Sequence, residues 1–273
     1  MNLKSFWEMI LSWFKKNDTK PEVKLPDVKG HNACFLVANG SVRMMNILSP
    51  KLLYDNFKTY VNQQKELGAN FVYLYTIDEK DGGWTPFSFY QGNSIGGTVD
   101  EAVVQDYQKR LQYIRDQNMG IVLWLRADDS PTFNKTARTQ QLKYQADVVS
   151  YFDKYVSAYV VGLEADEYMN ATTANDYAVE LGKLTSKEIG IHQKPGKYDF
   201  VLQAGFDTLW YQYGFNKNAS QIESDTKNVI AKIGGKKLYA AEYHLSSESE
   251  DAKKLGDAAM RGGASGTGNN RHV

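Results

Sequence analysis

The sequence predicts an α/β fold, a (β/α)8 TIM barrel with an N-terminal amphipathic helix, and three observations carry this prediction. Short runs rich in β-branched and aromatic residues alternate with longer stretches of helical periodicity. Helix start signals precede several of the longer stretches, and glycines close them just before the next run. Eight such units favour a closed barrel. An open doubly wound sheet is the structural alternative, although no G-x-G-x-x-G or P-loop supports its nucleotide-binding form.

The first residues predict an element separate from the barrel. Residues 1–17, "MNLKSFWEMILSWFKKN", carry apolar side chains at helical spacing, and residues 18–30 contain two prolines and few apolar residues, as a linker does. The barrel, expected as the catalytic domain, then covers residues 31–273. The helix either folds back to complete the barrel or docks on a membrane surface or a partner protein, because its tryptophans and lysines suit an interface.

The expected elements follow in order along the chain. We expect strands over residues 34–40, 71–78, 121–128, 158–165, 189–193, 207–214, 237–244 and 263–269. Helix starts are indicated by Ser49-Pro50 and by three capping boxes, and helix ends by glycines. The boxes pair Thr98 with Glu101, Ser220 with Glu223, and Ser247 with Glu250, and the closing glycines are Gly68, Gly120 and Gly234.

Charge and cysteine content exclude several classes of function. The chain has 32 basic and 32 acidic residues, so no net field favours nucleic acid as a partner. The single cysteine, Cys34, rules out disulfides within the chain. No apolar run is long enough for a membrane span, and the N-terminus lacks the cleavage site of a signal peptide, so we expect cytoplasmic synthesis. No motif indicates a cofactor, and we expect none.

Two glutamates end strands that lie three positions apart in the barrel. Glu164 follows the apolar run "AYVVGL", and Glu242 follows "KLYAA". Strict alternation puts Val160 and Gly162 on the face of Glu164, and Leu238 and Ala240 on the face of Glu242. Because parallel strands of a barrel end at one rim, the two carboxyl groups could face each other there, as glycoside cleavage requires.

This arrangement resembles clan A glycoside hydrolases, which carry an acid/base glutamate at the end of strand four and a nucleophilic glutamate at the end of strand seven. The stretch "LGANFVYLYT" (67–76) looks like the second strand of that clan. The resemblance implies a retaining glycosidase acting on a polysaccharide or glycan, with Glu164 as acid/base and Glu242 as nucleophile. Two positions depart from the clan: Leu163 replaces its asparagine before the acid, and "GASGTGNN" lacks its strand-eight tryptophan.

Further polar and aromatic residues near the strand ends could bind the sugar. Tyr211 or Tyr213 could donate a hydrogen bond to the nucleophile and keep it ionised. The long loop after the second strand carries Trp84, Phe87, Phe89 and Tyr90 among glycines, and could close over a sugar as a lid. The expected substrate-binding residues are Asn39, Asp78, Trp84, Arg126, Asp128, His192, Gln212, Tyr213 and His244.

Three other functions fit parts of this pattern. A carbohydrate-binding barrel that has lost catalysis would explain the two departures from the clan. A metal-dependent sugar isomerase could use Asp128, Glu164, His192 and Glu242 as ligands. A Schiff-base aldolase needs an inward lysine, for which Lys194 is the nearest candidate. Asp166 and Glu167 are expected as helix-capping or loop residues.

Overall fold

The protein folds as a closed parallel barrel. The computed structural model describes residues 30–35, 54–66, 69–75, 86–128, 130–243 and 252–269. Its strands pair in sequential order, and the first also pairs with the last, so the open doubly wound sheet is excluded. The strands are β1 (Gly30–Phe35), β2 (Phe71–Tyr75), β3 (Gly120–Trp124), β4 (Ala158–Val160), β5 (Glu188–His192), β6 (Thr208–Gln212), β7 (Lys237–Glu242) and β8 (Gly266–Asn269).

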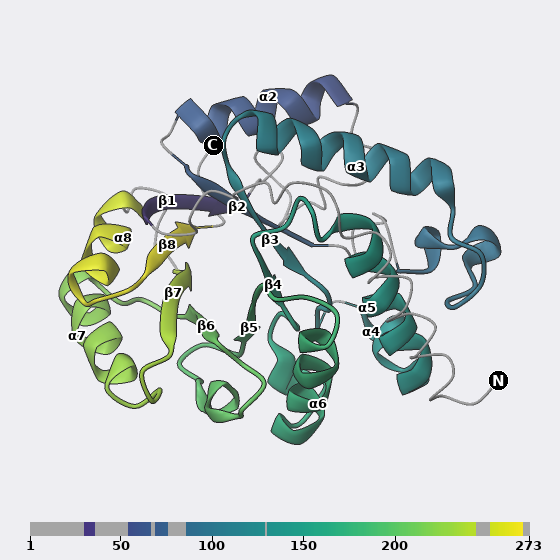
Figure 1. Cartoon of the computed structure of the whole chain (residues 1–273). Coiled ribbons are helices and arrows are strands. Elements are labelled where there is room, and N and C mark those ends of the chain that lie inside the picture. Colours follow the sequence, from purple (N-terminus) through teal and green to yellow (C-terminus); the bar gives the residue numbers. More distant parts are fainter. Residues whose placement is uncertain are drawn as a thin grey trace.

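Helices connect the strands and surround them (Figure 1). The α-helices are α2 (Tyr54–Glu66), α3 (Glu101–Asp116), α4 (Pro131–Asn134), α5 (Arg138–Phe152), α6 (Ala171–Gly182), α7 (Ala219–Ile230) and α8 (Ala252–Arg261). Short 3-10 helices are η1 (Pro86–Phe89), η2 (Gln91–Asn93), η3 (Ala165–Glu167) and η4 (Asp199–Leu202), of which η4 alone links β5 to β6. The expected N-terminal helix, the linker up to residue 29 and the Ser247 capping box lie outside the described residues.

Two of the expected helix starts are wrong by two residues. Helix α3 is capped by Asp100, whose carboxylate accepts hydrogen bonds from the backbone N–H groups of the next turn, and not by Thr98. Helix α7 begins after Asn218, which forms a capping box with Gln221. Aspartate caps helices better than threonine, so the stronger neighbouring cap prevails at α3, whereas at α7 asparagine and serine are caps of similar strength. No helix in the described ranges has the length and hydropathy to cross a bilayer.

The helix stop expected at Gly120 is also wrong. Gly120 is the first residue of β3, and α3 ends earlier, at Asp116. The left-handed turn between them is made by Asn118, with φ 61°. Asparagine tolerates this conformation better than most residues, so Asn118 occupies the turn position that was expected for a glycine.

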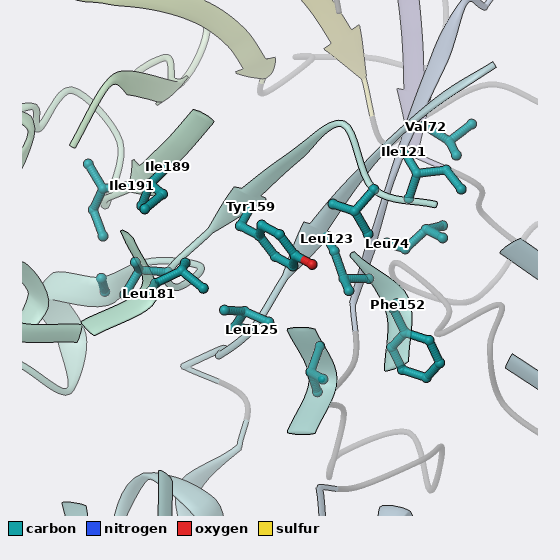
Figure 2. Packing of buried hydrophobic residues seen from close by; sticks show 14 of the residues in the cluster. Val72, Leu74, Ile121, Leu123, Leu125, Phe152, Tyr159, Leu181, Ile189 and Ile191 are labelled. Atoms are coloured by element: carbon teal, nitrogen blue, oxygen red, sulfur yellow. The ribbon is translucent and has the colours of Figure 1, made fainter. Parts of the chain in front are cut away.

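Two buried clusters sandwich the strand wall. The outer cluster lies between strands and helices, and Figure 2 shows part of it along β2 to β5 and around Phe152. The inner cluster fills the barrel with side chains from alternate strand positions, so the barrel is a packed core and not a pore. Its members are Phe71, Tyr73, Val122, Trp124, Ala127, Ala158, Val160, Leu163, Trp210, Tyr239 and Ala241.

Aromatic rings dominate the barrel interior. The indole of Trp210 stacks on the ring of Tyr239 at 4.5 Å, and the ring of Tyr73 stacks on Trp124 at 5.7 Å. Gly190 on β5 leaves space for this column, because a Cβ atom there would lie 2.5 Å from the Trp210 indole. The glycine within the run "IGIHQ" therefore serves close packing.

Candidate functional site

The chain at the end of β4 leaves strand geometry before it reaches Glu164. Val160 and Leu163 both belong to the inner cluster, whereas Val161 packs in the outer one. The expected alternation through Gly162 to Glu164 is therefore wrong beyond Val161. Glu164 itself adopts a left-handed backbone with φ 39° and ψ 45°. Such a conformation costs a residue with a side chain about 1–2 kcal/mol and is concentrated at functional sites.

The turn after β4 depends on a glycine. A Cβ atom on Gly162 would lie 2.2 Å from the hydroxyl oxygen of Tyr168, but 3.4 Å from the next ring atom. That hydroxyl is buried and makes no hydrogen bond to any described residue. Burial raises the pKa of the Tyr168 hydroxyl well above its ordinary value. The turn at Gly162 is thus closely packed against a single atom, the hydroxyl oxygen of Tyr168.

We expect Gly162→Ala to lower the free energy of unfolding by about 1–3 kcal/mol, the usual cost of overpacking. Adding Tyr168→Phe should restore stability, because it removes the only atom closer than 3.4 Å to the new methyl group. Tyr168→Phe alone should cost little, since its hydroxyl has no partner to lose. Urea unfolding of the four proteins measures this coupling. Additive effects of the two substitutions would contradict it.

A β-bulge turns Glu242 into the barrel. In β7, Ala240 pairs with Tyr211 and Glu242 pairs with Gln212, so Ala241 is an extra residue between two ladder positions. Leu238 and Ala240 accordingly pack in the outer cluster, and the expectation that they share a face with Glu242 is wrong. The backbone N–H of Tyr213 donates to the carbonyl of Glu242 at 3.0 Å and holds the shifted register.

The side chain of His192 lies between the two glutamates. His192 ends β5 and is fully buried. Its Nδ1 accepts a hydrogen bond from the backbone N–H of Glu164 at 3.1 Å, and its Nε2 lies 3.9 Å from Oε2 of Glu242. Because Nδ1 accepts, the proton of a neutral ring is on Nε2, which faces the Glu242 carboxylate. Elements β4, β5 and β7 therefore converge at one imidazole.

Aromatic side chains inside the barrel pack against His192. The ring of Trp124 lies 5.1 Å from the imidazole, and Trp124 stacks in turn on Tyr73. Gln212 is buried beside Glu242 in the ladder. Of the expected substrate-binding residues, His192, Gln212 and Asp128 are brought next to a glutamate, the first two next to Glu242 and Asp128 next to Glu164.

Glu164 belongs to a cluster of three carboxylates. Carboxylate oxygens of Asp128, Glu164 and Glu167 lie within 4.8 Å of one another. Glu167 also pairs with the ammonium of Lys194 at 3.2 Å, and Asp166 accepts a hydrogen bond from the Lys194 backbone at 2.8 Å. The hydrogen bond to Glu167 raises the pKa of Lys194, whereas a Schiff-base lysine needs a lowered pKa, so the aldolase loses support.

Arg126 does not face the barrel mouth, which corrects its expected role in binding. Its guanidinium is buried between strand and helices, where it donates to Oε1 of Gln145 at 3.1 and 3.2 Å. It also lies 3.8 Å from the ring centroid of Tyr177 on α6. Burial lowers the pKa of this guanidinium from its ordinary value. Arg126 therefore joins the barrel wall to α5 and α6.

Tyr211 and Tyr213 also point away from Glu242. The Tyr211 hydroxyl donates to Asp225 at 3.1 Å, and the Tyr213 hydroxyl shares a 2.6 Å hydrogen bond with Thr226. Both partners belong to α7, so the expected hydrogen bond from either tyrosine hydroxyl to the Glu242 carboxylate is not formed, and the Tyr213 side chain lies away from the barrel mouth. The strand alternation that brings Gln212 inward necessarily sends its neighbours outward.

The described part of the loop after β2 is core and not lid. Phe89 is packed against the rings of Tyr144 and Phe152, and Tyr90 donates a hydrogen bond to Asp147 at 2.7 Å. Both aromatic side chains are buried. The remaining candidates at Asn39, Asp78, Trp84 and His244, and the side chain of Phe87, lie outside what the structure describes.

Sequence reasoning missed Tyr73 and Trp124. Both occupy inward positions, on β2 and β3, and the aromatic column they form packs against the imidazole of His192. Their period-two spacing with Phe71 and Val122 was a signal that could have placed them inside the barrel.

The chain resembles known proteins in its structure but not in its sequence. No protein-family model matches the chain, and no curated protein matches its sequence. Among solved structures, an endo-1,4-β-mannanase from Rhizomucor miehei has 11% identity and a TM-score of 0.64, covering 82% of this chain and 84% of that one. An endo-β-1,4-mannanase from Thermotoga petrophila has 10% identity and a TM-score of 0.58, with 90% and 68% covered.

A glycoside hydrolase family 5 structure from Bacteroides vulgatus has 12% identity and a TM-score of 0.58, covering 80% of this chain and 55% of that chain. The likeness is one of fold. The chain has the (β/α)8 barrel of these glycoside hydrolases, as its resemblance to clan A implied. Barrels of one fold carry many different activities, which depend on the residues of each site.

The strained backbone at Glu164 predicts that replacing this residue by glycine does not destabilise the fold. We expect Glu164→Gly to unfold at equal or higher free energy, by up to about 1 kcal/mol, because glycine adopts φ 39° without strain. Glu180→Gly, within α6, is the matched control and should lose about 1 kcal/mol. Chemical denaturation compares them. A Glu164→Gly protein less stable than its control would show that the side chain supports the fold.

Proposed function

We propose that this protein is a retaining glycoside hydrolase that acts on a polysaccharide or glycan through Glu164 and Glu242. The observation that carries the proposal is the convergence on His192, which accepts from the backbone of Glu164 and faces the carboxylate of Glu242. The imidazole thus links the backbone that carries Glu164 to the carboxylate of Glu242, and glycoside cleavage needs two carboxyl groups from such neighbouring positions. The strained turn at Glu164 and the bulge before Glu242 add support, since such distortions gather at active sites.

In this mechanism Glu164 protonates the oxygen of the leaving sugar while the Glu242 carboxylate attacks the anomeric carbon. The glycosidic bond breaks, and a covalent glycosyl ester forms on Glu242. Glu164, now ionised, takes a proton from water, which attacks the same carbon and releases the sugar with its original configuration. The proton on Nε2 of His192 faces Glu242 throughout and stabilises its negative charge before attack and after release.

Release of reducing ends from a panel of glycans tests the proposal, with β-mannan included among plant, cell-wall and capsular polymers. We expect wild-type turnover that Glu164→Gln lowers by about 10²–10⁴-fold, the usual contribution of a general acid. Glu180→Gln, on the outer helix α6, should keep full activity. Proton NMR of the first product should show retained configuration. Binding without turnover on every polymer would favour a carbohydrate-binding barrel.

One observation favours a second candidate, a metal-dependent sugar isomerase. The trio of Asp128, Glu164 and Glu167 offers three oxygen ligands within 4.8 Å, which suits a hard divalent cation. It differs from the set expected from the sequence, because His192 and Glu242 are not part of the described trio. Turnover that EDTA abolishes and Mg²⁺ or Mn²⁺ restores would support the isomerase, whereas the glycosidase should not respond.

A further inference from the structure

The bulge that presents Glu242 is tied across the barrel interior to β2, a strand that is not its neighbour in the sheet. The hydroxyl of Tyr73 on β2 crosses the interior and donates a hydrogen bond of 2.6 Å to the carbonyl of Ala241. Ala241 is the extra residue of the β7 bulge and immediately precedes Glu242. Tyr73 and Ala241 are both buried, so water cannot substitute freely for this bond.

We propose that Tyr73 is a positioning residue that fixes the β7 bulge and thereby aims the Glu242 carboxylate at His192. A bulged residue lies outside the regular ladder, so its carbonyl needs a partner from elsewhere. Tyr73 supplies that partner from a rigid place, because its ring stacks on Trp124 and meets Trp210 edge-on at 5.5 Å. The proposal that this aim serves catalysis rests on the glycosidase function.

The orientation of Glu242 depends on this bulge in a simple way. Without the extra residue, β7 would keep strict alternation and place residue 242 on the face of Leu238 and Ala240, against the helices. With it, Glu242 pairs with Gln212 and lies 3.9 Å from Nε2 of His192. A bulge that loses its anchor can relax, and a reacting group displaced by about 1 Å can cost about 100-fold in rate.

The test compares Tyr73→Phe with Tyr239→Phe. Each variant removes one hydroxyl from a buried tyrosine of the inner cluster and keeps the ring. The Tyr239 hydroxyl, however, contacts Glu188 at the start of β5, far along the barrel from Glu242. We expect Tyr73→Phe to lower kcat by about 10- to 100-fold with KM within about 2-fold, and Tyr239→Phe to change neither.

A second readout does not need a substrate. Because Nε2 of His192 faces Glu242, its ¹⁵N chemical shift reports where the carboxylate lies, and His192→Gln assigns the signal. We expect the signal to move in Tyr73→Phe and to stay in Tyr239→Phe. A moved signal without wild-type turnover would uphold the positioning and defeat the glycosidase. Identical signals and equal kcat in the two variants would overturn the positioning, whatever the activity.

Discussion

Replacing Glu242 by glutamine is expected to lower kcat by more than about 10³-fold, because the amide cannot form the glycosyl ester. The substitution keeps the size of a side chain that is only 11% exposed, so the fold should not change. Reducing-end release under saturating substrate measures the loss. The matched control is Glu223→Gln on the outer face of α7, where the carboxylate pairs with Lys227 and Arg261 and should not affect turnover.

A second variant at the same position separates a nucleophile from a residue that only shapes the site. In Glu242→Ala, added azide can attack the anomeric carbon in place of the carboxylate while Glu164 still protonates the leaving group. We expect a glycosyl azide of inverted configuration, detected by NMR. Undiminished hydrolysis in Glu242→Gln would place the nucleophile elsewhere in the chain and remove the proposed mechanism.

Removing the indole of Trp210 is expected to produce the largest loss of stability. Trp210→Ala should lower the free energy of unfolding by about 3–5 kcal/mol, the usual cost of truncating a buried tryptophan. The residue is 1% exposed, stacks on Tyr239 and meets the rings of Phe71 and Tyr73. The described residues of the inner cluster around this cavity all come from strands and the turns that follow them, so the barrel wall would have to contract to fill it.

Equilibrium urea unfolding measures this effect, and the control is Leu202→Ala in η4. Leu202 is apolar but 51% exposed, so its truncation should change stability by less than about 0.5 kcal/mol. A loss for Trp210→Ala close to that of the control would mean that the barrel interior contributes little to stability.

The barrel was predictable because it rests on repetition. Runs of alternating apolar residues, helical stretches and closing glycines recur along the chain, and each unit reinforces the same topology. Each of the eight strands overlaps the range where the sequence placed it, although β1 begins four residues earlier than expected and β4 ends five residues earlier. Helix starts were less certain, as Asp100 and Asn218 show, because neighbouring polar residues compete for one capping position.

The candidate site was harder to predict because it depends on breaks in the periodicity. Alternation cannot reveal that Ala241 is an extra residue, yet that residue decides the direction of Glu242. Nor can it show that the chain before Glu164 turns through Leu163 into the barrel. Arg126 misled for another reason: a long side chain near a strand end can reach outward and bond the amides of α5.

The aromatic column inside the barrel gives the protein an intrinsic spectroscopic signal. The rings of Trp124 and Trp210 lie 6.2 Å apart and 67° from parallel, fixed in an asymmetric environment. Rigid aromatic packing of this kind produces near-ultraviolet circular dichroism, which disappears when packing loosens even if helices persist. Because Trp124 also lies against His192, a change at the glutamates should reach this signal. The state of the site can therefore be followed by light absorption in an unlabelled sample, before any substrate is known.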